Sequence, residues 1–251
     1  MPQPLIVQAA LAGPRLIGRA PLAFLAWVLL RLVEQYVTLA ILLGGRLTGA
    51  ALNVGAVWSV LASLPFEAIL VCALLRAQFR PQARAFAYLR AGGVELRMAG
   101  LLILGGLAGV VIALPVSIAA AYVGFGLKQP FLAGSALAIG AVVAALILMR
   151  LATVPAVLVD EQRVNLPRAL RASRGRFVLL AVLVIGAGVL ERMIGALPGL
   201  ASLPELASWS ALLSPLRLAG LAWRSLLGVA SLSVIAGAIA TVWRSSKQTL
   251  D

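Results

Sequence analysis

Histidine is absent from this 251-residue chain, and cysteine and acidic residues are scarce. Without histidine, the chain lacks the side chain that most often serves as a general base or a metal ligand. Its single cysteine, Cys72, excludes an intrachain disulfide, and its apolar surroundings indicate a thiol that fills space in a core. Only eight Asp and Glu residues accompany 21 Lys and Arg residues, which gives a formal net charge of +13. We therefore expect neither a metal site nor a cofactor.

Charged residues of either sign are also few. They make up 12% of the chain, whereas 62% of the residues are hydrophobic and the mean hydropathy is +1.05. A soluble domain is usually about 45–50% apolar and about 25% charged. Such a domain could not bury this much apolar surface, so the bilayer must be part of the solvent. The sequence predicts an all-α integral membrane protein with one domain over residues 1–251.

Six stretches are long and apolar enough to span a membrane, which takes about 20 residues for a hydrocarbon core of about 30 Å. They are Pro21–Leu43, Asn53–Leu75, Met98–Val123, Phe131–Met149, Phe177–Leu197 and Leu218–Trp243. The fourth could continue through Leu151–Val159, with Pro155 kinking it. The first run is too long for the core of a signal peptide and contains Arg31 and Glu34, so we expect it to be a retained helix. The prediction is a polytopic bundle of about six spans.

The basic residues are distributed unequally between the two ends of these spans. With the N-terminus inside, the inner side holds fifteen Lys and Arg residues and the outer side three, namely Arg46, Lys128 and Arg217. Such an excess is typical of cytoplasmic connectors. We therefore expect both termini to lie in the cytoplasm.

The inner connector before the fifth span has the pattern of an amphipathic helix. Asn165 is a plausible N-cap and Pro167 suits a first turn. Arg168, Arg171 and Arg174 follow at three-residue steps and share one flank. The opposite flank carries the apolar residues Leu166, Leu170 and Phe177. This pattern predicts a short helix lying on the cytosolic leaflet.

A similar but less regular pattern covers Pro81–Ala91, interrupted afterwards by Gly92 and Gly93. Here Phe86 and Leu89 would face lipid, whereas Arg84 and Tyr88 would face the cytosol. Each odd-numbered span thus follows a basic segment, which suggests an interfacial helix and a transmembrane hairpin repeated three times. Chance similarity between basic-then-apolar segments explains the pattern equally well.

Six ionisable residues lie within the predicted spans, where each is costly and requires an explanation. Arg31 and Glu34 are three residues apart and can pair on one helix face. Glu67 lies on the antiparallel neighbour at nearly the depth of Arg31. We predict a polar cluster of these three residues, serving either as an ion pair that locks the hairpin or as a relay for protons or substrate.

The other three residues, Glu191, Arg192 and Arg224, lie near the outer ends of the fifth and sixth spans. Both arginines are within reach of the headgroups by snorkelling. Glu191 cannot pair with Arg192 because adjacent helical residues point apart. Arg224 on the last span is therefore its predicted partner.

The inner arginines have two interpretations. Orientation alone accounts for most such charges, but polybasic segments near a leaflet also attract anionic lipid. Nucleic acid is excluded as a partner because the basic residues fall in short segments between apolar runs. We expect contact with anionic headgroups or with a membrane-protein partner through Arg84, Arg168, Arg171, Arg174 and Arg176.

No enzyme signature is found. The sequence contains no H-E-x-x-H, G-x-S-x-G, P-loop or G-x-G-x-x-G motif. The only adjacent carboxylates, Asp160 and Glu161, are expected in a solvated polar turn. Gly105 and Gly109 form a GxxxG pair, a spacing that lets helices approach closely. We therefore expect no catalysis.

One stretch resembles a segment of a known group of proteins. It contains Arg150, Pro155-Ala156, Asp160, Ala169-Leu170 and Ser173 before the basic run Arg174–Arg176. This order and spacing are similar to those of uncharacterised bacterial six-span membrane proteins, a group that includes the membrane domain fused to some glycerophosphodiester phosphodiesterases. The phosphodiesterase activity of the fused enzymes resides in a separate soluble domain. The resemblance therefore implies the architecture, a place in the bacterial inner membrane and a lipid-linked setting, but no hydrolase activity.

Three classes of function remain from the sequence. The first is a non-catalytic accessory protein or lipid-interacting scaffold. The second is a small permease with Arg31, Glu34, Glu67 and Glu191 along its path. The third, an intramembrane enzyme, is disfavoured by the missing motifs.

Overall fold

The computed structural model describes residues 4–47, 52–81, 86–129, 134–195 and 214–250, without the side chains of residues 45–47, 52–56, 192, 195, 216, 249 and 250. All regular structure in these residues is helical, which confirms the predicted all-α bundle. The elements are α1 (Leu5–Arg19), α2 (Pro21–Leu47), α3 (Leu52–Phe79), η1 (Phe86–Tyr88), α4 (Gly93–Gly126), α6 (Ala136–Leu148), η2 (Met149–Leu151), α7 (Val154–Glu161), α8 (Leu166–Ser173), α9 (Phe177–Gly195) and α11 (Pro215–Leu250).

Five helical segments are long and apolar enough to cross a membrane, and α8 with α9 forms a sixth that is bent by 86°. The five are Pro21–Gly44, Val57–Phe79, Gly93–Gly126, Ala136–Glu161 and Arg217–Gln248. The chain is a multi-pass membrane protein. The fourth segment continues to Glu161, and Pro155 lies in the first turn of α7 after the 3-10 turn η2. Proline is tolerated in a first helical turn because the N–H it lacks would be unpaired there.

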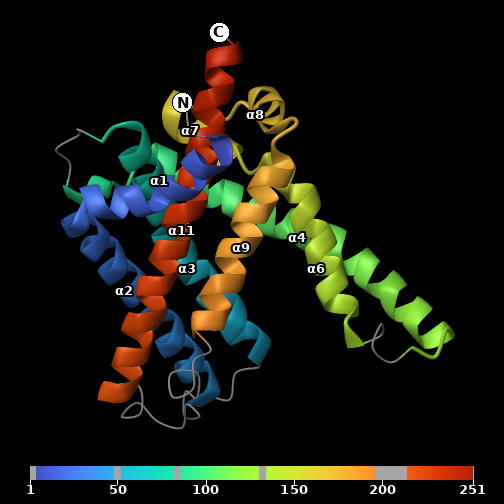
Figure 1. The fold of residues 1–251 in the computed structure, drawn as a ribbon. Coiled ribbons are helices and arrows are strands. Elements are labelled where there is room, and N and C mark those ends of the chain that lie inside the picture. Colours follow the sequence, from blue (N-terminus) through green and yellow to red (C-terminus); the bar gives the residue numbers. More distant parts are fainter. Residues whose placement is uncertain (1–3, 48–51, 82–85, 130–133, 196–213, 251) are drawn as a thin grey trace.

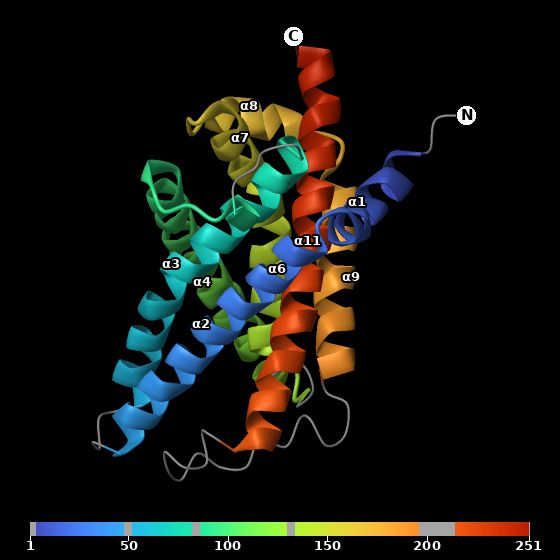
Figure 2. The ribbon, with the colours of Figure 1, turned by 90° about the vertical axis from the view of Figure 1, so that its left-hand side faces the viewer.

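The long helix α11 lies at the centre of the bundle and contacts α1, α2, α3, α7, α8 and α9 (Figures 1 and 2). The consecutive helices α2 and α3 pack as one hairpin, and α4 and α6 pack as another that projects to one side in Figure 1. In the most apolar window of α11, 61% of the residues are buried, against 6% in that of α4. The exposed apolar surface of α4 is therefore the part of the bundle that most requires lipid.

Glycines allow the closest helix crossings. A Cβ atom on Gly13 of α1 would lie 2.6 Å from backbone atoms of Val234 in α11, and one on Gly237 would lie 2.8 Å from the Gly13 nitrogen. In the second hairpin, a Cβ on Gly140 would lie 2.4 Å from the Ala113 oxygen. By contrast, a Cβ on Gly105 of the predicted GxxxG pair would meet no atom within 4 Å.

The predicted short helix before the fifth span is present as α8. The Asn165 side chain accepts a hydrogen bond from the Arg168 backbone N–H at 3.2 Å, and a proline occupies the first turn. The predicted N-cap is thus confirmed.

The segment before the third span differs from the prediction. Among its described residues only the 3-10 turn η1 forms, because the backbone of Ala87 and Tyr88 has φ values of 46° and 58° that end a helix. Phe86 is exposed as expected, but Tyr88 is buried and its hydroxyl donates to the Pro81 carbonyl at 2.9 Å. Leu89 packs against the core instead of facing lipid. The expectation for Arg84 lies outside the described residues.

Candidate functional site

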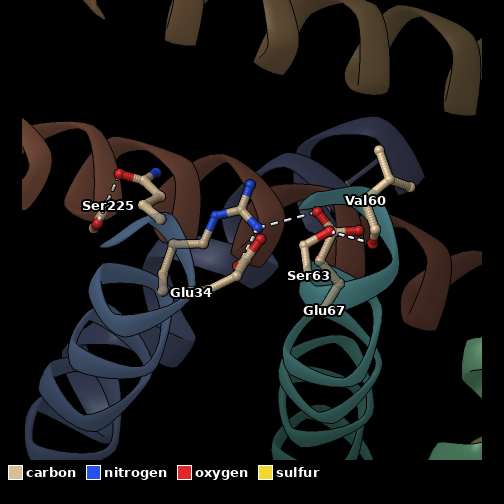
Figure 3. A network of polar contacts seen from close by, with 7 residues as sticks. Glu34, Val60, Ser63, Glu67 and Ser225 are labelled. Atoms are coloured by element: carbon tan, nitrogen blue, oxygen red, sulfur yellow. Dashed lines mark hydrogen bonds and ion pairs between the residues drawn. The ribbon is translucent and has the colours of Figure 1, made fainter. Parts of the chain in front are cut away.

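A cluster of three charged side chains lies between α2 and α3. The Arg31 guanidinium donates through Nη1 to Oε2 of Glu34 at 2.5 Å and to Oε1 of Glu67 at 3.1 Å (Figure 3). The Glu34 side chain is 6% exposed and that of Arg31 is 20% exposed. The structure brings together the three residues that helix spacing and depth assigned to one cluster. One arginine shared by two carboxylates fastens α2 to α3.

A pocket of about 300 Å³ opens beside this cluster. Arg31 and Glu34 form part of its wall, and Arg224 lines it from α11. Its other polar lining residues are Gln35, Thr38, Ser59 and Ser63. Nearby, the Ser225 hydroxyl donates to the Gln35 side-chain oxygen at 3.2 Å, which ties α11 to α2 (Figure 3).

The predicted ion pair between Glu191 and Arg224 is wrong. Glu191 lines a separate apolar pocket between α9 and α11, together with Leu227 and Ser231. Arg224 instead lines the pocket beside Arg31. A Cβ on Gly228 would lie 3.5 Å from Oε1 of Glu191 and 3.7 Å from Nε of Arg31. The side chain of Arg192 lies outside the described residues.

The inner end of the bundle is joined by side chains that the sequence placed in solvent or at the headgroups. Asp160 accepts hydrogen bonds from Trp243 Nε1 and Lys247 Nζ, both at 2.9 Å. Glu161 pairs with Arg168 at 2.8 Å, and the Arg168 guanidinium also lies 5.7 Å from the centre of the Trp243 ring. The two carboxylates therefore hold α7 and α8 against α11, and the expected solvated turn is wrong for both.

Arg176 is likewise engaged within the protein. Its guanidinium donates to the Val242 carbonyl at 3.2 Å and to the hydroxyls of Ser245 and Ser246 at 2.5 and 2.7 Å. The Ser246 hydroxyl bonds in turn to the Ala172 carbonyl at 3.1 Å. Of the five arginines expected at headgroups, Arg168 and Arg176 thus have protein partners.

Of the other three, Arg84 lies outside the described residues, and Arg171 and Arg174 are exposed on α8 and at its end. Arg171 makes one long hydrogen bond, from Nε to the Pro167 carbonyl of its own helix at 3.4 Å. Both positions leave the guanidinium accessible to a headgroup.

Sequence reasoning missed a second buried ion pair, between Arg76 at the end of α3 and Glu95 in the first turn of α4. Glu95 is 6% exposed, and Arg76 also donates to the Tyr88 carbonyl at 3.4 Å. The sequence feature that could have predicted this pair is that both residues lie at helix ends on either side of the same connector. An acidic side chain in the first turn is favoured by the helix dipole.

A polar pocket of about 510 Å³ lies at the inner end between α1, α3 and α11. Three of its lining residues are arginines, Arg15, Arg19 and Arg244. The other described lining residues include Gln8, Gln78, Gln248, Thr241 and Ser245, which can donate hydrogen bonds, and none of those described is Asp or Glu. The pocket therefore has the chemistry of an anion site. An adjoining pocket of about 340 Å³ combines Arg76, Arg80 and Arg90 with Asp160.

The described residues contain no group of three or more Cys, Asp or Glu side chains placed to hold a metal ion. No protein-family model matches the chain, and neither a curated protein nor a solved structure matches it.

Proposed function

We propose that this chain is a non-catalytic accessory protein or lipid-interacting scaffold of the bacterial inner membrane. Both termini lie in the cytoplasm, and the arginine-rich cytosolic end associates with anionic phospholipid. The resemblance of residues 150–176 to the six-span bacterial group supports the same lipid-linked setting.

The observation that carries the proposal is the surface of α8. Ala169, Ala172 and Ser173 form its buried face, whereas Leu166 and Leu170 are 45% and 40% exposed. The exposed arginines Arg171 and Arg174 accompany these leucines. A helix that shows both apolar and cationic side chains suits the boundary between headgroups and acyl chains. The bend of 86° to α9 lets α8 lie along a leaflet while α9 crosses it.

The orientation rests on the asymmetry of charge. Fifteen Lys and Arg residues fall on the side of α1, α8 and the C-terminus, and three fall on the other side. The same end of the bundle holds the arginine-lined pocket. Cytosolic leaflets carry anionic lipid, which attracts basic residues by about 1 kcal/mol each.

A lipid-competition experiment tests the proposal. Purified protein in nanodiscs with equimolar phosphatidylglycerol and phosphatidylcholine is released in a native mass spectrometer, and the bound lipids are counted. We expect phosphatidylglycerol to predominate. Arg171→Gln with Arg174→Gln should reduce this preference by about thirtyfold at most, since two charges contribute about 2 kcal/mol.

The matched control is Lys128→Gln, which removes a cation from the opposite side of the membrane. It should leave the lipid preference unchanged. Equal retention of the two lipids by the wild-type protein would contradict the proposal.

A permease is the second candidate, and the pocket beside Arg31 favours it. Arg224 of α11 lines that pocket together with Arg31, and polar residues from α2 and α3 accompany them. A path for solute would use this space. Vesicle uptake of small anions that is lost in Arg224→Gln, with folding intact, would favour transport over the scaffold role.

A further inference from the structure

We infer that the pocket between α1, α3 and α11 is a specific site for one phosphate-bearing anion, at the headgroup level of the cytosolic leaflet. The inference rests on the proposed function for the side of the membrane it faces. It goes further by assigning a site that holds one anion per protein molecule, separate from the general attraction of α8 for anionic lipid.

The wall contributed by α1 carries three polar side chains on one helix face. Gln8, Ala12, Arg15 and Arg19 line the pocket, at helical steps of four, three and four residues. This spacing places them on one face of the helix. The two arginines lie one turn apart, so two guanidiniums approach the pocket from the same side.

The wall contributed by α11 repeats this arrangement. Thr241, Arg244, Ser245 and Gln248 line the pocket at steps of three, one and three residues. Arg244 is held in place, because its guanidinium donates to the Gln78 carbonyl and lies 5.4 Å from the centre of the Phe79 ring. A cation so positioned loses less conformational freedom when it binds an anion.

The floor joins the two walls. Gln78 at the end of α3 donates through Nε2 to the Ala12 carbonyl of α1 at 3.0 Å. The backbone carbonyl of Gln78 accepts a hydrogen bond from the Arg244 guanidinium. The glycine crossing described above sets the separation of α1 from α11, with Gly13 against Val234. The site is therefore built by three helices rather than by one flexible arm.

The charge of the lining identifies the ligand class. Three arginines and no carboxylate are found among the described residues that line the pocket, and the nearby Asp160 is engaged by Trp243 and Lys247. Like charges on one helix face repel, so an anion between them stabilises the arrangement. The planar fork of each guanidinium matches the oxygens of a phosphate group. Phosphate thus suits this site better than a zwitterion or an uncharged solute.

The experiment counts tightly held phospholipid by native mass spectrometry after stepwise delipidation, using Arg15→Gln with Arg19→Gln. The matched control is Arg171→Gln with Arg174→Gln, which removes the same charge from α8. We expect one phospholipid to survive delipidation on the wild type and on the control. In the pocket variant its affinity should fall by about thirtyfold, at about fivefold for each removed charge. The affinity of Arg15→Lys with Arg19→Lys for the phospholipid should fall less, because lysine keeps the positive charge and lacks only the planar guanidinium.

A second arm identifies the source of the phosphate. If glycerol 3-phosphate alone binds the delipidated wild type and displaces the lipid, a soluble phosphate compound fills the site. If only the phospholipid binds, the headgroup fills it. Either result supports the site, provided that the pocket variant loses the binding and keeps wild-type helical content. Unchanged one-to-one retention by the pocket variant would overturn the inference. If the wild-type protein showed no overall preference for phosphatidylglycerol but still held one phospholipid in the pocket, the result would count against the proposed function alone.

Discussion

The crossing of α1 over α11 leads to a sharp prediction about a single methyl group. In Gly13→Ala the new Cβ would lie 2.6 Å from backbone atoms of Val234, whereas ordinary contacts of a Cβ lie at 3.4–4 Å. Backbone atoms cannot rotate away, so α1 must move by about 1 Å from α11. Inserting a methyl group into a packed site costs about 1–3 kcal/mol. We expect the upper end of this range, and an apparent unfolding midpoint lowered by about 6–12 °C in detergent.

Gly18→Ala is the matched control on the same helix, since no atom lies within 4 Å of its added Cβ. Alanine favours a helix over glycine by up to about 1 kcal/mol, so this variant should be neutral or slightly more stable. Gly13→Ala should also weaken the one-to-one phospholipid retention although it removes no charge. Equal midpoints for the two variants would refute the close crossing, because a methyl group would then fit equally well at both positions.

Other side-chain contacts give three further predictions. Arg31→Met alone should destabilise the protein by about 3–5 kcal/mol, because it leaves Glu34 buried without its partner. Adding Glu34→Gln should recover part of this loss, and a double-mutant cycle in detergent that gave additive effects would contradict the pairing. Asn165→Ala should cost about 1 kcal/mol through loss of the N-cap, measured as faster proteolysis of the connector before α8 than in wild type. Asp160→Asn should lose the contact with Lys247, so that high salt lowers the midpoint of the wild type more than that of the variant; equal salt dependence would count against this ion pair.

The fold class could be predicted from composition, and five of the six predicted spans coincide with helices long and apolar enough to cross a membrane. The predicted fifth span, Phe177–Leu197, qualifies only when α9 is taken together with α8. The sequence also predicts the cluster of Arg31, Glu34 and Glu67, since a hairpin places residues of equal depth side by side. The N-cap at Asn165 follows from local chemistry alone. These features depend on short sequence separations or on a single hairpin.

Contacts between distant helices could not be predicted in the same way. The predicted pairing of Glu191 with Arg224 was wrong. The rotation of α9 and α11 about their own axes is set by packing, and it leaves no charge pattern in the sequence. Asp160 lies in α7 and binds Lys247 across 87 positions, although its polar neighbours in the sequence suggested a solvated turn. The arginine-lined pocket combines residues from both ends of the chain, so only the fold reveals it. In each case the missing information was the relative placement of helices.

The most direct test of the central claim is the lipid composition around the wild-type protein, extracted in its own membrane patch without detergent. We expect phosphatidylglycerol and cardiolipin to be enriched over the bulk membrane, with one phospholipid that resists exchange. A patch with the bulk composition and freely exchanging lipid would contradict a lipid-interacting scaffold.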